Sequence, residues 1–155
     1  METIAVVLRQ PEQIELNRLA LTPPTADDVV VDVDWSGVST GTERLLWSGR
    51  MPPFPGMGYP LVPGYESVGR VVEAGTATGL HPGQRVFVPG AKCFGEVRGL
   101  FGASASRLVA TAKRVVPLDQ NLGERGILLA LAATAYHAIA AQGAQAPDCI
   151  VGHGV

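Results

Sequence analysis

Cysteine is scarce in this sequence, which contains two cysteines, Cys93 and Cys149, far apart along the chain. Neither belongs to a closely spaced group, so the sequence offers no disulfide framework and no cysteine-based metal motif. A chain with lone, unpaired cysteines is typical of a reducing compartment. We therefore expect a cytoplasmic protein.

Charged residues are also few, at 17% of 155 residues, and the formal net charge is -2. A chain without a basic excess has no electrostatic reason to bind nucleic acid or an anionic membrane surface. The longest apolar run, from Gly126 to Ala141, is interrupted by polar residues and is too short to span a bilayer. We expect neither a nucleic-acid partner nor membrane insertion.

Glycine and proline are abundant, with 19 and 12 residues, which favours turns and short strands over a helical bundle. Alternating or β-branched runs predict strands over 3–8, 14–19, 29–35, 67–72, 85–88, 104–110 and 114–117. A short helix is expected over 42–47, and a longer one over 122–142 with Asn121 as its N-cap. The fold class is therefore mainly β with a few helices.

The strand over 29–35 is expected to have two different faces, because side chains alternate along a strand. One face would carry the apolar residues Val29, Val31, Val33 and Trp35. The other would carry Val30, Asp32 and Asp34. We expect both aspartates to meet solvent.

The stretch from Pro60 to Gly75 organises the rest of the chain. Two prolines impose an extended approach, and Gly64 allows a tight turn before the strand that begins at Ser67. Tyr65 and Glu66 therefore lie where a loop enters a rigid strand, a common place for functional side chains. On the residues alone, two polar side chains facing water explain the pattern equally well.

Four segments of the sequence resemble the medium-chain alcohol dehydrogenase superfamily. Gly64-Tyr65-Glu66 resembles its Gly-His-Glu motif, and the segment 37–43 resembles its Gly-(Ile/Val)-Cys-x-(Thr/Ser)-Asp turn. The segments 82–86 and 133–139 resemble its Pro-Gly-Asp-Arg-Val and Thr-Ala-Tyr-x-Ala-Leu motifs. The resemblance implies a GroES-like, partly open β-barrel over 1–147 and hydride transfer with NAD.

The resemblance also shows a departure at the positions of the family's zinc ligands. Ser39 or Thr40 stands where the family has cysteine, Tyr65 stands where it has histidine, and only Glu66 matches. Zinc prefers sulfur and imidazole ligands, so we expect no zinc. The candidate catalytic residues then form a metal-free proton relay, with Tyr65 as donor and shuttle and Glu66 either orienting it or continuing the relay. Ser39, Thr40 and Thr42 extend that relay.

Within the superfamily, the Ser-Thr-Gly-Thr-Glu and Gly-Tyr-Glu patterns most resemble a branch that oxidises the hydroxyethyl group of a bacteriochlorophyllide in bacteriochlorophyll synthesis. That resemblance implies a tetrapyrrole substrate carrying a propionate. Candidate substrate-binding residues are Arg44 and Arg50 for the carboxylate, and Trp47, Phe54 and Tyr59, with Met51 and Met57, for the flat ring. A structural loop packed on the protein body explains the apolar part of this segment equally well.

The residues 148–155 resemble the first strand of a Rossmann domain that runs into Gly-x-Gly. Gly152 and Gly154 would then contact the cofactor, and most of the NAD-binding domain would lie in residues that the sequence does not contain. We expect a domain boundary between 147 and 148. An unpaired last strand would also favour a homo-oligomer.

Two other interpretations remain open from the sequence. One is a quinone-reductase-like member of the same superfamily, which also lacks zinc. The other is a non-catalytic GroES-like binding module, against which the helix over 122–142 and the terminal Gly-x-Gly argue.

Overall fold

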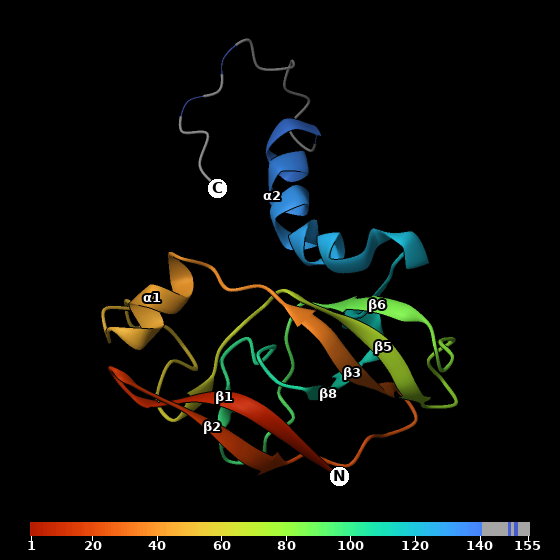
Figure 1. Cartoon of the computed structure of the whole chain (residues 1–155), viewed down its shortest axis with the longest axis horizontal. Coiled ribbons are helices and arrows are strands. Elements are labelled where there is room, and N and C mark those ends of the chain that lie inside the picture. The colour runs from red at the N-terminus through yellow and green to blue at the C-terminus, as the bar shows by residue number, and fades with distance from the viewer. Residues whose placement is uncertain (141–148, 150, 152–155) are drawn as a thin grey trace.

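The chain folds into two β-sheets with helical segments on one side (Figure 1). The computed structural model describes residues 1–140, 149 and 151. In this part of the chain one sheet has the strand order β2-β1-β4-β7 and the other β8-β3-β5-β6-β9. The sheets stay open and do not close into a barrel. The expected mainly β, partly open GroES-like architecture is confirmed.

The first sheet is built on a hairpin of β1 (Glu2–Gln10) and β2 (Gln13–Ala20). The strands predicted over 3–8 and 14–19 are therefore confirmed. Two short strands complete the sheet: β4 (Leu61–Val62) pairs with β1, and β7 (Arg98–Gly99) runs parallel to β4. The sequence analysis missed both, because a two-residue strand is defined by its partner and not by periodicity.

The second sheet is centred on β3 (Asp28–Ser36) and β5 (Ser67–Ala74), which pair antiparallel. The strands β6 (Arg85–Val88), β8 (Arg107–Thr111) and β9 (Val116–Pro117) extend it on both sides. The strand predicted over 104–110 begins later than expected. Residues 103–106 bond instead to the segment 60–64 and to β1, as in Ser104 N–H to Pro63 O at 2.9 Å.

The two faces predicted for β3 hold over its first part and fail at its end. Val30 is fully buried, like Val29 and Val31, so both faces of the strand are covered there, and its pairing with β8 is regular. Trp35, by contrast, is 52% exposed. Between Val33 and Trp35 the strand has one extra residue opposite β5, and such a bulge interrupts the alternation in a way that the sequence pattern cannot reveal.

The two aspartates of β3 meet solvent as expected, with side chains 44% and 36% exposed, and both also pair with arginines on neighbouring strands. Asp32 accepts a hydrogen bond from Arg107 Nη2 at 2.8 Å. Asp34 lies 3.7 Å from Arg70 Nε and 3.8 Å from Arg85 Nη1. These cross-strand ion pairs fix the polar face of the sheet.

Two clusters of buried apolar side chains hold the sheets together. The larger lies between the sheets and contains valines of β3, β5 and β6 with residues of β1 and β8. The smaller surrounds Leu46 and joins the short helix to the first sheet through Leu8, Leu61 and Leu100. The position of that helix is therefore set by packing and not only by its own backbone hydrogen bonds.

The short helix α1 (Thr42–Trp47) has the bounds that the sequence predicted. The long helix predicted over 122–142 is wrong in its first part. Residues 120–128 form a 3₁₀ segment, η2 (Gln120–Leu128), and the α-helix α2 (Leu129–Ala140) follows. Gly123 has φ 54, which breaks the helix, and Asp119 rather than Asn121 is the N-cap. A second short 3₁₀ segment, η1 (Ala112–Arg114), precedes β9.

In Figure 1, α2 stands away from the two sheets, and α1 lies at one end of the molecule. Within residues 1–140, 149 and 151, no helix has the length and hydrophobicity needed to cross a bilayer. The strand expected over 149–155 and the boundary at 147 fall largely outside the described residues.

Candidate active site

Glu66 is a buried carboxylate at the start of β5. Its side chain is 6% exposed, and its Oε1 has no hydrogen-bond partner among the described residues. Gly64, with φ 93, turns the chain so that Glu66 enters the protein, and the hydroxyl of Ser67 anchors the turn on Ala103 O at 2.7 Å. Burial raises the pKa of Glu66 above its ordinary value. A carboxyl group in this environment is suited to take up a proton.

Ser39 is bonded to the short helix through a second carboxylate, that of Glu43. The backbone N–H of Ser39 donates to Glu43 Oε2 at 2.9 Å, and the Ser39 hydroxyl accepts from the N–H of Thr42 at 3.2 Å. Burial raises the pKa of Glu43, backbone N–H groups oppose this, and the charge of Glu66 adds to it. The pKa of Glu43 therefore depends on the charge of Glu66.

The sequence analysis missed Glu43 as a site residue and placed it only in the first turn of the helix. The available signal was its spacing: a glutamate near a helix start that follows a serine often reaches back to a backbone N–H of the preceding turn. Here Glu43 reaches the N–H of Ser39, so it fixes the loop that faces Glu66.

Three of the predicted catalytic residues, Ser39, Thr40 and Glu66, line one cleft with a volume of about 330 Å³. Its other wall is apolar and comes from η2 and α2 through Ile127, Leu128 and Leu131. One carboxylate and two hydroxyls thus face an apolar surface. Such an arrangement can hold an alcohol oxygen and receive its proton. Thr42 lies behind this cleft and supports Ser39.

A second cavity, of about 490 Å³, lies beside α1 and contains three predicted substrate-binding residues: Arg44, Trp47 and Arg50. Thr40 lines this cavity as well as the cleft, so the two adjoin. None of the ion pairs in the described part of the chain engages either arginine. Glu12 also lines the cavity, so two cations face one carboxylate there. The cavity is suited to an anionic, partly apolar ligand.

The other residues expected to form the apolar wall lie elsewhere. Tyr59 donates a hydrogen bond to Leu46 O, and burial raises the pKa of its hydroxyl. Together with Met51 and Met57 it packs on the cluster around Leu46. Phe54 is 38% exposed and lines neither the cleft nor the cavity. The structural role that the sequence left open therefore accounts for the contacts of Tyr59.

Tyr65 is not among the residues that line the cleft, although Glu66 follows it directly. Its ring contacts Phe101 edge to face, with centroids 5.3 Å apart and planes at 71°. The sequence analysis missed Phe101, because neither its spacing nor its neighbours distinguish it from a packing residue.

The donor set of the cleft does not fit zinc. Glu66 supplies one carboxylate, Ser39 and Thr40 supply neutral hydroxyls, and no side chain that lines the cleft supplies sulfur or imidazole. Zinc sites in proteins are built mainly from cysteine and histidine. Within the described ranges, no three His, Cys, Asp or Glu side chains come together as a metal site.

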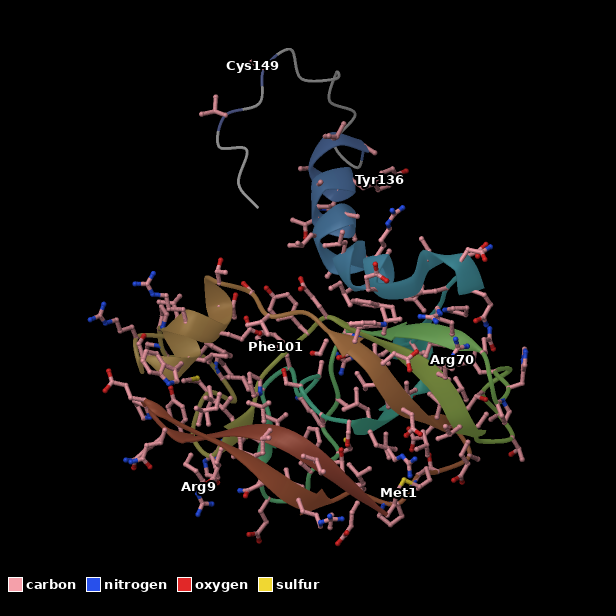
Figure 2. The ribbon with its side chains drawn as sticks, in the orientation of Figure 1. Met1, Arg9, Arg70, Phe101, Tyr136 and Cys149 are labelled. Atoms are coloured by element: carbon pink, nitrogen blue, oxygen red, sulfur yellow. The ribbon has the colours of Figure 1, made fainter. Side chains whose placement is uncertain are left out.

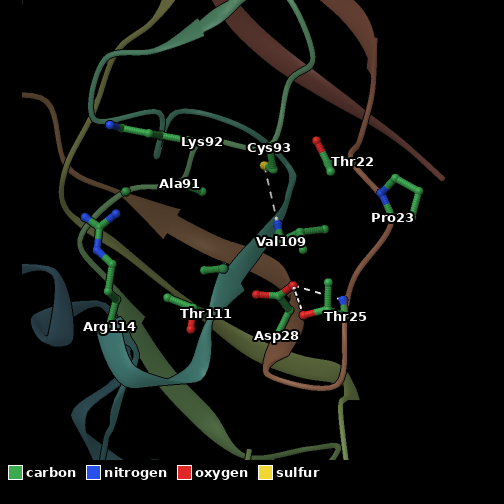
Figure 3. Close-up of a pocket in the computed structure, with 12 residues that line it drawn as sticks. Thr22, Pro23, Thr25, Asp28, Ala91, Lys92, Cys93, Val109, Thr111 and Arg114 are labelled. Carbon is green, nitrogen blue, oxygen red and sulfur yellow. Dashed lines mark hydrogen bonds between the residues drawn. The ribbon is translucent and has the colours of Figure 1, made fainter. Parts of the chain in front are cut away.

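Cys93 lies in a different place, a pocket of about 230 Å³ shown in Figure 3. Its thiol is buried and accepts a long hydrogen bond from the N–H of Val109 at 3.5 Å. Burial raises the pKa of this thiol. Asp28, also in Figure 3, accepts hydrogen bonds from the N–H and hydroxyl of Thr25. Cys93 is therefore a packing residue in a pocket that shares no residue with the cleft.

The predicted cofactor contacts, Gly152 and Gly154, lie outside the described residues.

Comparison with known proteins identifies the family to which the chain belongs. Residues 25–120 match the alcohol dehydrogenase GroES-like domain. The chain is 57% identical over 155 residues to the 2-desacetyl-2-hydroxyethyl bacteriochlorophyllide A dehydrogenase of Rhodobacter capsulatus, and 55% identical over 159 residues to that of Cereibacter sphaeroides. Each match covers 99% of this chain, and 49% and 50% of those proteins. The chain spans about half the length of the curated relatives it matches.

Solved structures agree on the fold. The 2R,3R-butanediol dehydrogenase of Bacillus subtilis superposes with a TM-score of 0.71 at 21% identity, covering 88% of this chain and 46% of that one. At this identity the likeness concerns the fold alone. Because the match to the family extends over most of the described sheets, the chain belongs to the alcohol dehydrogenase GroES-like domain family of the medium-chain dehydrogenases.

Proposed function

We propose that this chain is the substrate side of an NAD-dependent dehydrogenase that oxidises the hydroxyethyl group of a bacteriochlorophyllide to an acetyl group without zinc. Two relatives, 57% and 55% identical to the chain, are named as dehydrogenases of a hydroxyethyl bacteriochlorophyllide, and these names support the proposed substrate. The observation that carries the proposal is the cleft containing Glu66, which adjoins a cavity containing two arginines through Thr40.

The two spaces match the two ends of such a substrate. The hydroxyethyl group enters the cleft beside Ser39 and Glu66, and the macrocycle extends past Thr40 toward Trp47. A propionate at the rim of the ring then pairs with Arg44 or Arg50, for which the described residues provide no competing ion pair.

The cleft also fits the flat ring of a nicotinamide, because an apolar wall of Ile127, Leu128 and Leu131 faces the hydroxyls of Ser39 and Thr40. A bound NAD would supply the acceptor for the hydride of the carbinol carbon. The remaining contacts to the cofactor are proposed for Gly152 and Gly154.

The protein residues handle the oxygen and the proton. Glu66 takes the proton of the alcohol as the carbon–oxygen bond becomes double, and its raised pKa suits that uptake. The hydroxyls of Ser39 and Thr40 donate hydrogen bonds to the oxygen while negative charge develops on it. Glu43 holds Ser39 in place through its backbone N–H. The reaction releases one hydride and one proton for each ketone formed.

The test is turnover of the full-length protein with the hydroxyethyl bacteriochlorophyllide and NAD. We expect NADH formation matched by a product two mass units lighter than the substrate. Glu66→Gln should lower kcat about 100-fold or more with little change in KM. Glu96→Gln, on an exposed glutamate outside the cleft, is the matched control. A wild-type protein that instead reduces quinones with NADPH and leaves the hydroxyethyl group intact would overturn the proposal in favour of a quinone reductase.

The proposal includes a cytoplasmic location. The two cysteines are both free in the structure, which is compatible with a reducing compartment. Self-association remains a prediction, and sedimentation of the full-length protein tests it.

A further inference from the structure

Phe101 has a backbone conformation that a phenylalanine rarely adopts. Its φ is 62°, in the left-handed region, where the Cβ atom approaches the backbone too closely. A glycine would adopt the same conformation without strain. A bulky residue at such a position is therefore a genuine outlier, and outliers of this kind concentrate at functional sites.

The neighbouring backbone holds Phe101 in this conformation from both sides. The segment 98–104 is bonded along the segment 60–64, through Arg98 N–H to Pro60 O at 3.1 Å and Gly102 N–H to Val62 O at 3.1 Å. On the other side, Gly90 lies so close that a Cβ there would collide with the carbonyl oxygen of Phe101. The hydrogen bonds on either side of Phe101 and the close approach of Gly90 therefore hold its backbone in the left-handed conformation.

The ring of Phe101 is only partly buried by contacts with the rest of the protein. It is 40% exposed, and its aromatic contact is the edge-to-face pair with Tyr65. Figure 2 shows Phe101 in the region between α1 and the foot of α2. The chain thus keeps a strained residue whose large apolar ring remains accessible, and packing of the core does not explain it.

We propose that Phe101 and Tyr65 form an aromatic corner that binds the flat conjugated ring of the substrate, with Phe101 as the residue that selects a macrocycle over a small alcohol. The inference rests on the proposed function, because it concerns the same substrate. Two rings at 71° offer one face and one edge, and a flat conjugated ligand can pack against both.

The position of the corner relative to the carboxylate supports this role. Tyr65 immediately precedes Glu66 in the chain, so the corner begins one residue before the carboxylate of the cleft. The hydroxyethyl group is attached directly to the edge of the macrocycle. A ring bound at the corner would carry this substituent toward Glu66, whereas Phe101 does not line the cleft that would hold a small secondary alcohol.

The test measures binding separately from turnover, in the full-length protein. The probe is a bacteriochlorophyllide analogue with an ethyl group in place of the hydroxyethyl group, titrated by fluorescence. Phe101→Leu should raise its Kd about threefold to tenfold, and Phe101→Trp should keep it within about twofold of wild type. Val72→Ala removes an equally exposed apolar side chain, 41% against 40%, and should leave Kd unchanged.

Phe101→Gly separates the strain from the ring. It should keep or raise the thermal midpoint because it relieves the left-handed conformation, and it should weaken binding at least as much as Phe101→Leu. The thermal midpoints of Phe101→Leu and Phe101→Trp should stay close to that of wild type.

The two proposals fail in different ways. If wild type binds the ethyl analogue and Phe101→Leu weakens that binding, the corner stands even when the hydroxyethyl compound is not oxidised. If wild type oxidises the hydroxyethyl compound but the Kd of the analogue is the same in wild type, Phe101→Leu and Phe101→Gly, the corner is overturned and the proposed function stands. Equal losses of macrocycle binding in Phe101→Leu and Phe101→Trp, together with lower thermal midpoints in both, would also overturn it, since the effect would then be structural.

Discussion

The backbone N–H of Gly37 donates to the carbonyl oxygen of Glu66 at 2.6 Å, and the Glu66 carboxylate occupies the space that a side chain at position 37 would need. Gly37 also lines the cleft with Ser39 and Thr40. The glycine thus allows the loop and the buried carboxylate to approach each other closely. Any larger residue at position 37 must displace one of them.

Gly37→Ala should therefore disturb both stability and activity. Displacing Glu66 or the loop should lower the free energy of unfolding by about 1–3 kcal/mol, as overpacking does, and should lower kcat. Urea denaturation and steady-state kinetics of the full-length protein measure the two effects.

Gly41→Ala is the matched control, because its added Cβ meets only the Ser39 hydroxyl at 3.9 Å and its φ is -88°. As the N-cap of α1 it should cost under about 1 kcal/mol. Equal losses in the two variants would contradict the close approach of Gly37 and Glu66.

Local patterns in the sequence predicted much of this fold. The helix 42–47 and the strand 85–88 have their predicted bounds, because each is defined by its own residues. Long-range contacts decided the rest. The pair of short strands at Leu61 and Arg98 exists only through mutual hydrogen bonding, and the bulge of β3 at Asp34 depends on its partner strand.

The candidate site shows the same division. The sequence located Glu66 and Ser39 through motifs, and the structure brings them to one cleft. It could not show that Tyr65 turns toward Phe101, because that contact depends on a positive φ and on a close approach of Gly90. Nor could it show that Tyr59 bonds the helix backbone through its hydroxyl.

Arg44 and Arg50 should affect substrate binding more than chemistry. Removing either from the cavity beside Trp47 takes away one partner of the propionate, so Arg44→Ala or Arg50→Ala should raise KM about tenfold with kcat nearly unchanged. Steady-state kinetics with the hydroxyethyl bacteriochlorophyllide measure this. Esterifying the propionate should reproduce the loss in wild type and add little in the variants.

Arg18→Ala is the control for a general loss of positive charge. Arg18 is an exposed arginine on β2 that pairs with Glu2, and its removal should leave KM unchanged. If both cavity variants bind the free acid and the ester as wild type does, the propionate does not contact these arginines.

Zinc should not accompany the protein in stoichiometric amounts. The cleft offers the oxygens of Glu66, Ser39 and Thr40, which are weak ligands for zinc. Metal analysis of protein purified without chelator should give far less than one zinc per chain, and added zinc should not increase kcat. A full equivalent of zinc that disappears in Glu66→Gln would show that the metal-free mechanism is wrong.

Stability should fall as pH rises through the titration of the two buried glutamates. Burial raises the pKa of both Glu43 and Glu66 above the ordinary glutamate value of 4.5, with the charge of Glu66 adding to the effect at Glu43. At a pH between 4.5 and the raised values, the folded protein binds more protons than the unfolded chain, so the free energy of unfolding decreases with pH. Their contribution is complete below pH 4.5 and is lost as pH passes their folded pKa values.

Glu66→Gln replaces one of the two buried glutamates by a side chain that does not titrate. Relative to wild type, the variant should gain stability as pH rises from 4.5 through the folded pKa of Glu66 and should keep that gain at higher pH, as measured by urea denaturation at each pH. Val72→Ala changes no titratable group, so its difference from wild type should stay constant across the same range. A difference between Glu66→Gln and wild type that is flat, or that shifts in favour of wild type at high pH, would mean that the Glu66 carboxylate is as well stabilised inside the protein as in water.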